Sequence, residues 1–343
     1  MPQRPGKSDQ RDGRAPPAHA IGFERWRSWL FGLILIAALV TAIGHWGEIA
    51  VFTRLVREAE PLWLGLAIAL QLGTYASVAM AWREILRAAS ASRRLSLLMR
   101  IAVTKLFADQ ALPGAGMGGN VLLVAQLRAQ GIPRGAAVAV PLISTIGFYA
   151  AYAFFAIAML VLLWLNDQAT PLMAGTVTLF LCVAIAIPGL ALWLRKRGSA
   201  PLPPRFERIA PVRSLVESVA QAPARLLNDR GLLIRVAAYN ALVFLADAGT
   251  LFACLRALGT TADLSTSFIA VIMASIVATL GPIPLGLGSF EATSIATLRL
   301  LGVPFEAGLA GTMLLRLLTL WLPLLPGMIL MRGAMKRARP HLR

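Results

Sequence analysis

The chain is dominated by apolar blocks about 20 residues long, and this pattern restricts the possible folds more than any other feature. At a helical rise of about 1.5 Å per residue, such a block crosses the hydrocarbon core of a bilayer. Charged residues make up only 14% of the 343 residues, against roughly 25% in an ordinary globular chain. The pattern predicts an all-α polytopic membrane protein with about six spanning helices, at residues 29–46, 62–82, 135–164, 172–194, 232–255 and 306–331.

The two ends of the chain differ from its centre. Residues 1–28 are polar and rich in Pro, Gly and Arg, which predicts a disordered tail. The apolar run that follows has no small-residue cleavage site and closes at Trp46, so it predicts a retained first span instead of a cleaved signal peptide. We therefore expect one transmembrane domain, residues 29–331, between two basic tails, residues 1–28 and 332–343.

The distribution of basic residues predicts the orientation of the chain in the membrane. Basic residues are concentrated in both tails, in residues 83–100 and in the loop 195–230. The loops predicted on the opposite side, residues 47–61, 165–171, 258–264 and 302–305, contain only Arg54 and Arg57. By the positive-inside rule, the basic segments and both termini should lie in the cytoplasm, with the chain in the inner membrane. The net charge of +17 suits an anionic leaflet. A nucleic-acid partner is not expected, because no soluble domain remains to present the charge.

Two further apolar stretches, residues 101–127 and 265–301, are interrupted at their centres by Gly and Pro and resemble each other. Chance matches among common residues are one explanation, but several identities at one constant offset favour an internal repeat with halves at about 62–164 and 232–331. The identical pairs, all separated by the same interval of half the chain, are Pro113 and Pro284, Arg128 and Arg299, Gly131 and Gly302, Pro133 and Pro304, and Ala136 and Ala307.

The predicted orientation makes the repeat informative. The first interrupted stretch enters from the cytoplasm and the second from outside, which is an inverted-topology repeat with two re-entrant broken-helix hairpins. Broken helices are tolerated at that depth only where protein or a water-filled cavity satisfies the freed backbone groups. A Gly/Pro elbow in each half therefore predicts a cavity near the bilayer midplane.

At these elbows the chain resembles the transmembrane, flippase-like region of the lysylphosphatidylglycerol synthase family, and the resemblance covers nearly all of residues 29–331. The family pattern at the second elbow is Pro, Gly, Gly, any residue, Gly, two residues, Glu. Here only Leu285 departs from it, and a later family arginine matches Arg316. The matching segment reads Pro284, Leu285, Gly286, Leu287, Gly288, Ser289, Phe290, Glu291.

The first elbow matches the family less closely. Pro113 and Gly114 agree, but the usual Gly-Glu followed by Arg is replaced by Gly119, Asn120 and apolar residues, and the Glu-Arg-x-x-Asp of the next span is absent. The resemblance therefore implies the family fold more strongly than a shared substrate. Only a short tail follows Met331, so the resemblance implies a stand-alone member without aminoacyltransferase activity of its own.

Charged residues at bilayer depth are candidate functional residues, because each costs roughly 3 kcal/mol or more there. Asp247 lies near the middle of the fifth predicted span, Arg316 lies in the sixth, and Glu291 begins the returning half of the second elbow. Lys105 and Asp109 are four residues apart and share a helix face.

These charges also have structural explanations. Lys105 and Asp109 can pair within their helix. Glu291 can complement the positive end of its half-helix or pair with Arg316. Asp247 can bond to a neighbouring helix through polar contacts such as Asn240.

Both returning half-helices should begin near the midplane, at about residues 119–120 and 289–290. Unpaired backbone amides there form an anion site, and glycines let a ligand approach the backbone. Close helix packing is the alternative role for these glycines. The predicted substrate-binding residues are Gly114, Gly116, Gly118, Gly119, Asn120, Asp247, Pro284, Gly286, Gly288, Ser289, Glu291 and Arg316, with Lys105 and Asp109 as secondary candidates.

The sequence favours a flippase or transporter for a lipid or lipid-linked substrate, either an anionic phospholipid or a polyprenyl-linked molecule. The alternative is a non-transporting subunit that presents a lipid carrier to a partner glycosyltransferase or lipid synthase. A membrane-embedded transferase is least favoured, because no acidic metal motif or nucleophile–base pair stands out. We expect no catalytic residue, metal or cofactor.

Overall fold

The computed structural model describes residues 57–111, 117–165, 170–197, 223–281, 286–323 and 326. The predicted first span, residues 29–46, and both tails lie outside these residues. So do Gly114, Gly116 and Pro284 of the predicted elbows. All of the described residues belong to one compact unit.

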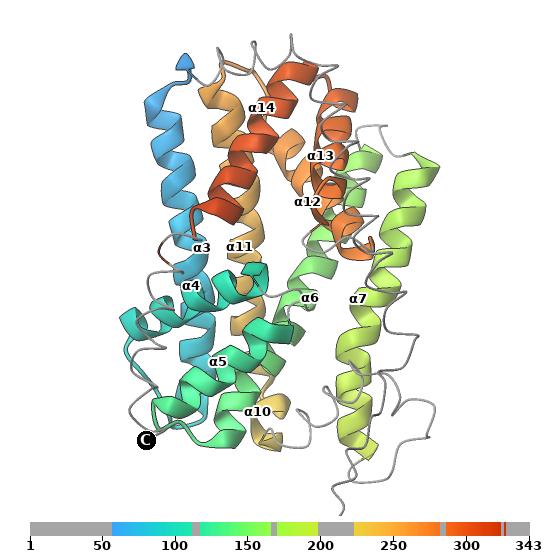
Figure 1. Ribbon diagram of the computed structural model, residues 1–343. Coiled ribbons are helices and arrows are strands. Elements are labelled where there is room, and N and C mark those ends of the chain that lie inside the picture. Colours follow the sequence, from blue (N-terminus) through green and yellow to red (C-terminus); the bar gives the residue numbers. More distant parts are fainter. Residues whose placement is uncertain are drawn as a thin grey trace, which may run out of the picture. The chain divides into compact units, whose positions relative to one another are not determined.

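The described part of the chain is helical and has no strand, as the sequence predicts (Figure 1). Its helices are α3 (Pro61–Ala88), α4 (Leu95–Ala111), α5 (Met117–Ala129), α6 (Arg134–Leu165), α7 (Pro171–Arg197), α10 (Ala224–Asn228), α11 (Arg230–Ala257), α12 (Leu264–Leu280), α13 (Ser289–Leu300), α14 (Phe305–Arg316) and the π-helix η2 (Leu317–Trp321).

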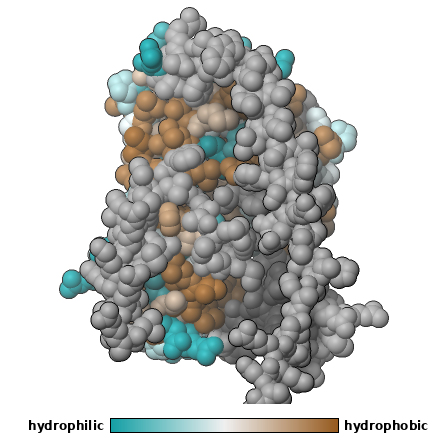
Figure 2. All heavy atoms as spheres, viewed as in Figure 1, coloured by the Kyte–Doolittle hydropathy of each residue, from teal (hydrophilic) through white to brown (hydrophobic). Residues whose placement is uncertain are grey.

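Three of the described helices, α3, α6 and α11, are long and apolar enough to cross a bilayer. Shorter apolar helices cover Pro171–Ala186 and Leu264–Leu280. Large apolar side chains also point outward: on α6, Phe154, Ile157 and Trp164 are more than half exposed. In Figure 2 hydrophobic residues lie over the middle of the visible face, and hydrophilic ones lie mostly towards its two ends. These observations confirm a helical membrane protein.

Aspartates begin two of the helices in the second half of the chain. Asp229 accepts a hydrogen bond from the Leu232 amide at 2.9 Å, and Asp263 accepts one from the Thr266 amide at 2.7 Å. Each bond satisfies an N–H group that has no partner within the first turn of the helix. Hydrogen bonds from Thr266 also hold the pKa of the exposed Asp263 carboxyl below its ordinary value. The starts of α11 and α12 are therefore fixed locally by sequence.

The helices of the two predicted halves follow one another in the same order and at nearly the same spacing. The starts of α3, α4, α5 and α6 are each followed, at almost the interval that separates the identical residues, by the starts of α11, α12, α13 and α14. In Figure 1, α3 and α11 run side by side, the α4–α5 hairpin lies in the lower half and the α12–α13 hairpin in the upper half.

The turns that follow the two hairpins are also alike. After α5, Gly131 has φ +75° and the Ile132 amide donates to the Leu127 carbonyl at 3.3 Å. After α13, Gly302 has φ +87° and the Val303 amide donates to the Leu298 carbonyl at 2.9 Å. Both turns are Schellman motifs, which need a residue at positive φ. The identity of Gly131 and Gly302 in sequence therefore has a backbone cause.

Candidate functional site

The second elbow is shaped by two glycines between α12 and α13. Gly286 has φ +60°, and a Cβ atom added there would collide with the Cβ of Ala278 and lie 3.2 Å from its Cα. Gly288 has φ +84° and is the N-cap of α13, with open space where a Cβ would lie. Gly286 is therefore required by both its backbone conformation and close packing, whereas Gly288 is required by its conformation alone.

Glu291 joins this elbow to α14. One carboxylate oxygen accepts a 2.6 Å hydrogen bond from the Gly288 amide, and the other accepts a 2.5 Å bond from Nε of Arg316. The two side chains are only 14% and 12% exposed. Both structural roles expected for Glu291, at the start of its helix and as the partner of Arg316, are therefore present together.

Arg316 is held on more than one side. Its guanidinium lies over the Phe290 ring, 4.5 Å from the centroid, and Nη2 lies 3.5 Å from the Gly286 carbonyl oxygen. The stacked ring and the carboxylate fix the plane of the guanidinium. A second hydrogen bond, from Ser289 Oγ to the Gly286 carbonyl at 3.2 Å, tightens the elbow. The geometry thus places a preoriented cation beside the turn.

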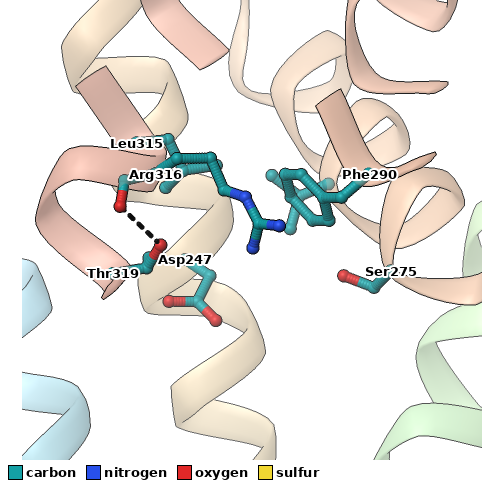
Figure 3. Close-up of a pocket in the computed structure, with 7 residues that line it drawn as sticks. Asp247, Ser275, Phe290, Leu315, Arg316 and Thr319 are labelled. Atoms are coloured by element: carbon teal, nitrogen blue, oxygen red, sulfur yellow. Dashed lines mark hydrogen bonds between the residues drawn. The ribbon is translucent and has the colours of Figure 1, made fainter. Parts of the chain in front are cut away.

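A cavity of about 120 Å³ opens next to this pair (Figure 3). It has room for several water molecules or one small polar group. The Asp247 carboxylate and the Arg316 guanidinium both face it from neighbouring helices. Its lining combines these two charges with polar and apolar side chains: Asp247, Val271, Ser275, Phe290, Leu315, Arg316 and Thr319.

Asp247 lies ten residues before the end of α11, which is about 15 Å along the helix. Its Oδ1 atom is buried and has no hydrogen-bond partner. Asn240, expected as a polar neighbour of the kind that could hold Asp247, instead donates to the Val236 carbonyl of its own helix at 2.8 Å. Asn240 is therefore not the partner of Asp247, and the expected polar contact with a neighbouring helix is made by another residue.

The polar neighbour of Asp247 is Gln71 of α3, which also neighbours Tyr75. Both side chains are at least nine-tenths buried, and Gln71 Oε1 and Tyr75 Oη have no hydrogen-bond partner. Neither residue is among those predicted from the sequence. A signal was present, since Gln71, Thr74 and Tyr75 are polar residues at helical spacing inside an otherwise apolar block.

The first elbow holds a different ion pair. Lys105 Nζ lies 2.6 Å from Asp109 Oδ2, which confirms the expected pair within α4. Asp109 Oδ1 has no hydrogen-bond partner, and a Cβ atom added at Gly119 would collide with it. Gly119 therefore makes room for this carboxylate beside the first turn of α5. The helix begins at Met117, slightly before the expected start at residues 119–120.

Of the predicted residues, Asp247 and Arg316 line the cavity, whereas Gly286 and Glu291 contact Arg316 from outside the lining. The described residues of the first elbow are not part of the lining. Gly118 and Asn120 lie in the first turn of α5 with Gly119. At the offset that relates the identical residues of the repeat, Asp247, Glu291 and Arg316 correspond to Ala76, Asn120 and Thr145. None of these three is charged, so the three charges of the second half have no charged equivalent at the corresponding positions of the first. Among the residues described, no group of three or more His, Cys, Asp or Glu side chains could hold a metal ion.

Comparison with known protein families agrees with this architecture. The family model described as the lysylphosphatidylglycerol synthase TM region matches residues 29–327, which include every described helix. A comparison with curated proteins gave no match. The matched range also contains both elbows and the charged cavity. The chain belongs to the lysylphosphatidylglycerol synthase transmembrane family.

Proposed function

We propose that this protein moves a lipid or lipid-linked molecule across the inner membrane, with its polar head group passing the cavity beside the second elbow. The observation that carries the proposal is a preoriented arginine at a broken helix, facing a polar cavity inside a helical membrane domain. Charged side chains at that depth are costly, and where they occur they commonly mark a substrate or ion pathway. The family's association with phospholipids supports the choice of a lipid.

The matched helix order of the two halves supports an inverted repeat. Two hairpins that interrupt the membrane from opposite sides would allow access to the cavity from either leaflet in turn, as in other repeat-built transporters. The similar Schellman turns after α5 and α13 are further support, because the same backbone conformation recurs at the same register.

In this proposal Arg316 binds the lipid phosphate. Its guanidinium has the planar fork that suits phosphate oxygens, and the adjacent stacked Phe290 ring keeps it in place. The start of α13 adds a positive helix end close by. Glu291 partly neutralises Arg316 and keeps binding weak enough for release.

The test is lipid movement by the purified protein in liposomes. Fluorescently labelled phosphatidylglycerol and a labelled polyprenyl phosphate are offered in one leaflet, with labelled phosphatidylcholine as the zwitterionic control. We expect one of the anionic lipids to exchange at least tenfold faster than in empty liposomes. Saturable binding without exchange would contradict transport and favour the alternative, a subunit that presents a lipid carrier to a partner glycosyltransferase or lipid synthase.

The proposed topology places the N-terminus, the loop 195–230 and the C-terminus in the cytoplasm. In a background with Cys182 and Cys254 replaced, Ser214→Cys should react with a membrane-impermeant thiol reagent only after the inner membrane is opened. Thr261→Cys, in the loop before α12, should react in intact spheroplasts. The physical reason is the concentration of basic residues in the first loop. Labelling of Ser214→Cys from outside would overturn the topology and the inverted repeat.

A further inference from the structure

Three buried oxygen atoms at or near Asp247 have no hydrogen-bond partner. They are Asp247 Oδ1 on α11 and Gln71 Oε1 and Tyr75 Oη on α3. Two of the three, a carboxylate and an amide oxygen, can only accept hydrogen bonds. The third, the Tyr75 hydroxyl, can also donate. Buried acceptors without a donor are rare and costly, so the Asp247 and Gln71 oxygens lack a proton or another donor.

The charges around the cavity also indicate that a proton is missing, because they do not balance. Glu291 and Arg316 form an ion pair and together contribute no net charge. No ion pair links Asp247 to a basic side chain in the part of the chain that is described. An ionised Asp247 therefore leaves the cavity with one net negative charge, which opposes the entry of an anionic head group.

The other charged residues of α3 and α11 lie towards the ends of these helices, so few other titratable groups lie near Asp247. They are Tyr75 on α3, Tyr152 on α6, which lies 4.8 Å from the Phe244 ring of α11, Arg316 on α14, and Glu291 on α13 behind it. The α12 helix contributes Ser275, which does not titrate in this range. Near neutral pH only Asp247 among these groups is a carboxyl without a cationic partner.

We propose that Asp247, with Gln71 and Tyr75, is a proton-binding site, and that proton uptake at Asp247 accompanies the binding of a phosphate-bearing lipid in the adjacent cavity. The added proton gives Asp247 a donor for the Gln71 carbonyl oxygen and removes the net negative charge that would repel the phosphate. A singly charged phosphate and one proton then enter together, with no net charge. The inference rests on the proposed lipid site.

The test is binding of a short-chain phosphatidylglycerol to the full-length protein in phosphatidylcholine nanodiscs between pH 5.5 and 8.5. Wild-type affinity should fall at least tenfold as the pH rises, because the protonated form binds the anion. Asp247→Asn mimics the neutral carboxyl, so its affinity should stay at the acid-end value throughout. Asp263→Asn, which removes an exposed carboxyl outside the cavity, should retain the wild-type pH dependence.

Calorimetry of the wild-type protein provides a readout that needs no variant. In two buffers with different heats of ionisation, phosphatidylglycerol binding should show proton uptake in the middle of the pH range, and none should accompany binding to Asp247→Asn. Binding without proton uptake in the wild type would overturn this inference alone. No binding at any pH would overturn the lipid site as well.

Discussion

Arg316→Gln should reduce lipid movement about 30-fold while leaving the yield of folded protein close to that of the wild type. The loss corresponds to one charge-assisted hydrogen bond to phosphate, about 2 kcal/mol. Folding should survive because Glu291 keeps its bond from the Gly288 amide and remains at the positive end of α13. The measurement pairs monodisperse yield after detergent extraction with the exchange rate in liposomes.

Glu291→Gln distinguishes a role of the Glu291–Arg316 pair in folding from a role in lipid movement. A glutamine can still accept from the Gly288 amide, but it leaves Arg316 without its carboxylate, so some loss of folded protein is expected. The double variant should regain that yield and remain inactive. Arg299→Gln, at the exposed end of α13, is the matched control and should behave as the wild type. Recovery of activity together with yield in the double variant would make the pair purely structural.

Gly286→Ala should abolish lipid movement and sharply reduce folded protein, whereas Gly288→Ala should have the smaller effect. At Gly286 the new Cβ collides with the Ala278 Cβ in a left-handed backbone, so packing and conformation are both violated. At Gly288 only the conformation is strained, which costs about 1–3 kcal/mol. Yield and exchange rate are measured for both, and the bulkier Gly286→Leu and Gly288→Leu should follow the same order.

A second substitution separates the two reasons why Gly286→Ala should be harmful, which are the collision with Ala278 and the positive φ. Combining Gly286→Ala with Ala278→Gly removes the side-chain collision and leaves the positive φ unchanged. Yield should therefore recover only in part, to about the level of Gly288→Ala. Gly259→Ala, at φ +74° with open space, is the control for backbone strain far from the cavity. Equal effects of Gly286→Ala and Gly288→Ala would show that the close approach to α12 is unimportant.

Much of the local structure could be predicted from the sequence, because its causes are local. The Gly/Pro interruptions mark where α4 and α12 end and α5 and α13 begin, and the constant offset relates helices that start at nearly equivalent positions. The ion pair of Lys105 and Asp109 follows from a spacing of four residues. The family pattern at the second elbow identified Glu291 and Arg316, which the structure joins directly.

The sequence by itself determined the membrane class, the positions of the helix pairs α4–α5 and α12–α13, and the charged candidates. Only the tertiary structure decided that Gln71 and Tyr75 lie beside Asp247, that Phe290 stacks on Arg316, and that Asp247 and Arg316 face one cavity. The reason is that lipid is as apolar as a protein core, so hydropathy gives the depth of a residue but not the face on which it lies. The contact between α3 and α11 sets that rotation, and these two helices come from opposite halves of the chain.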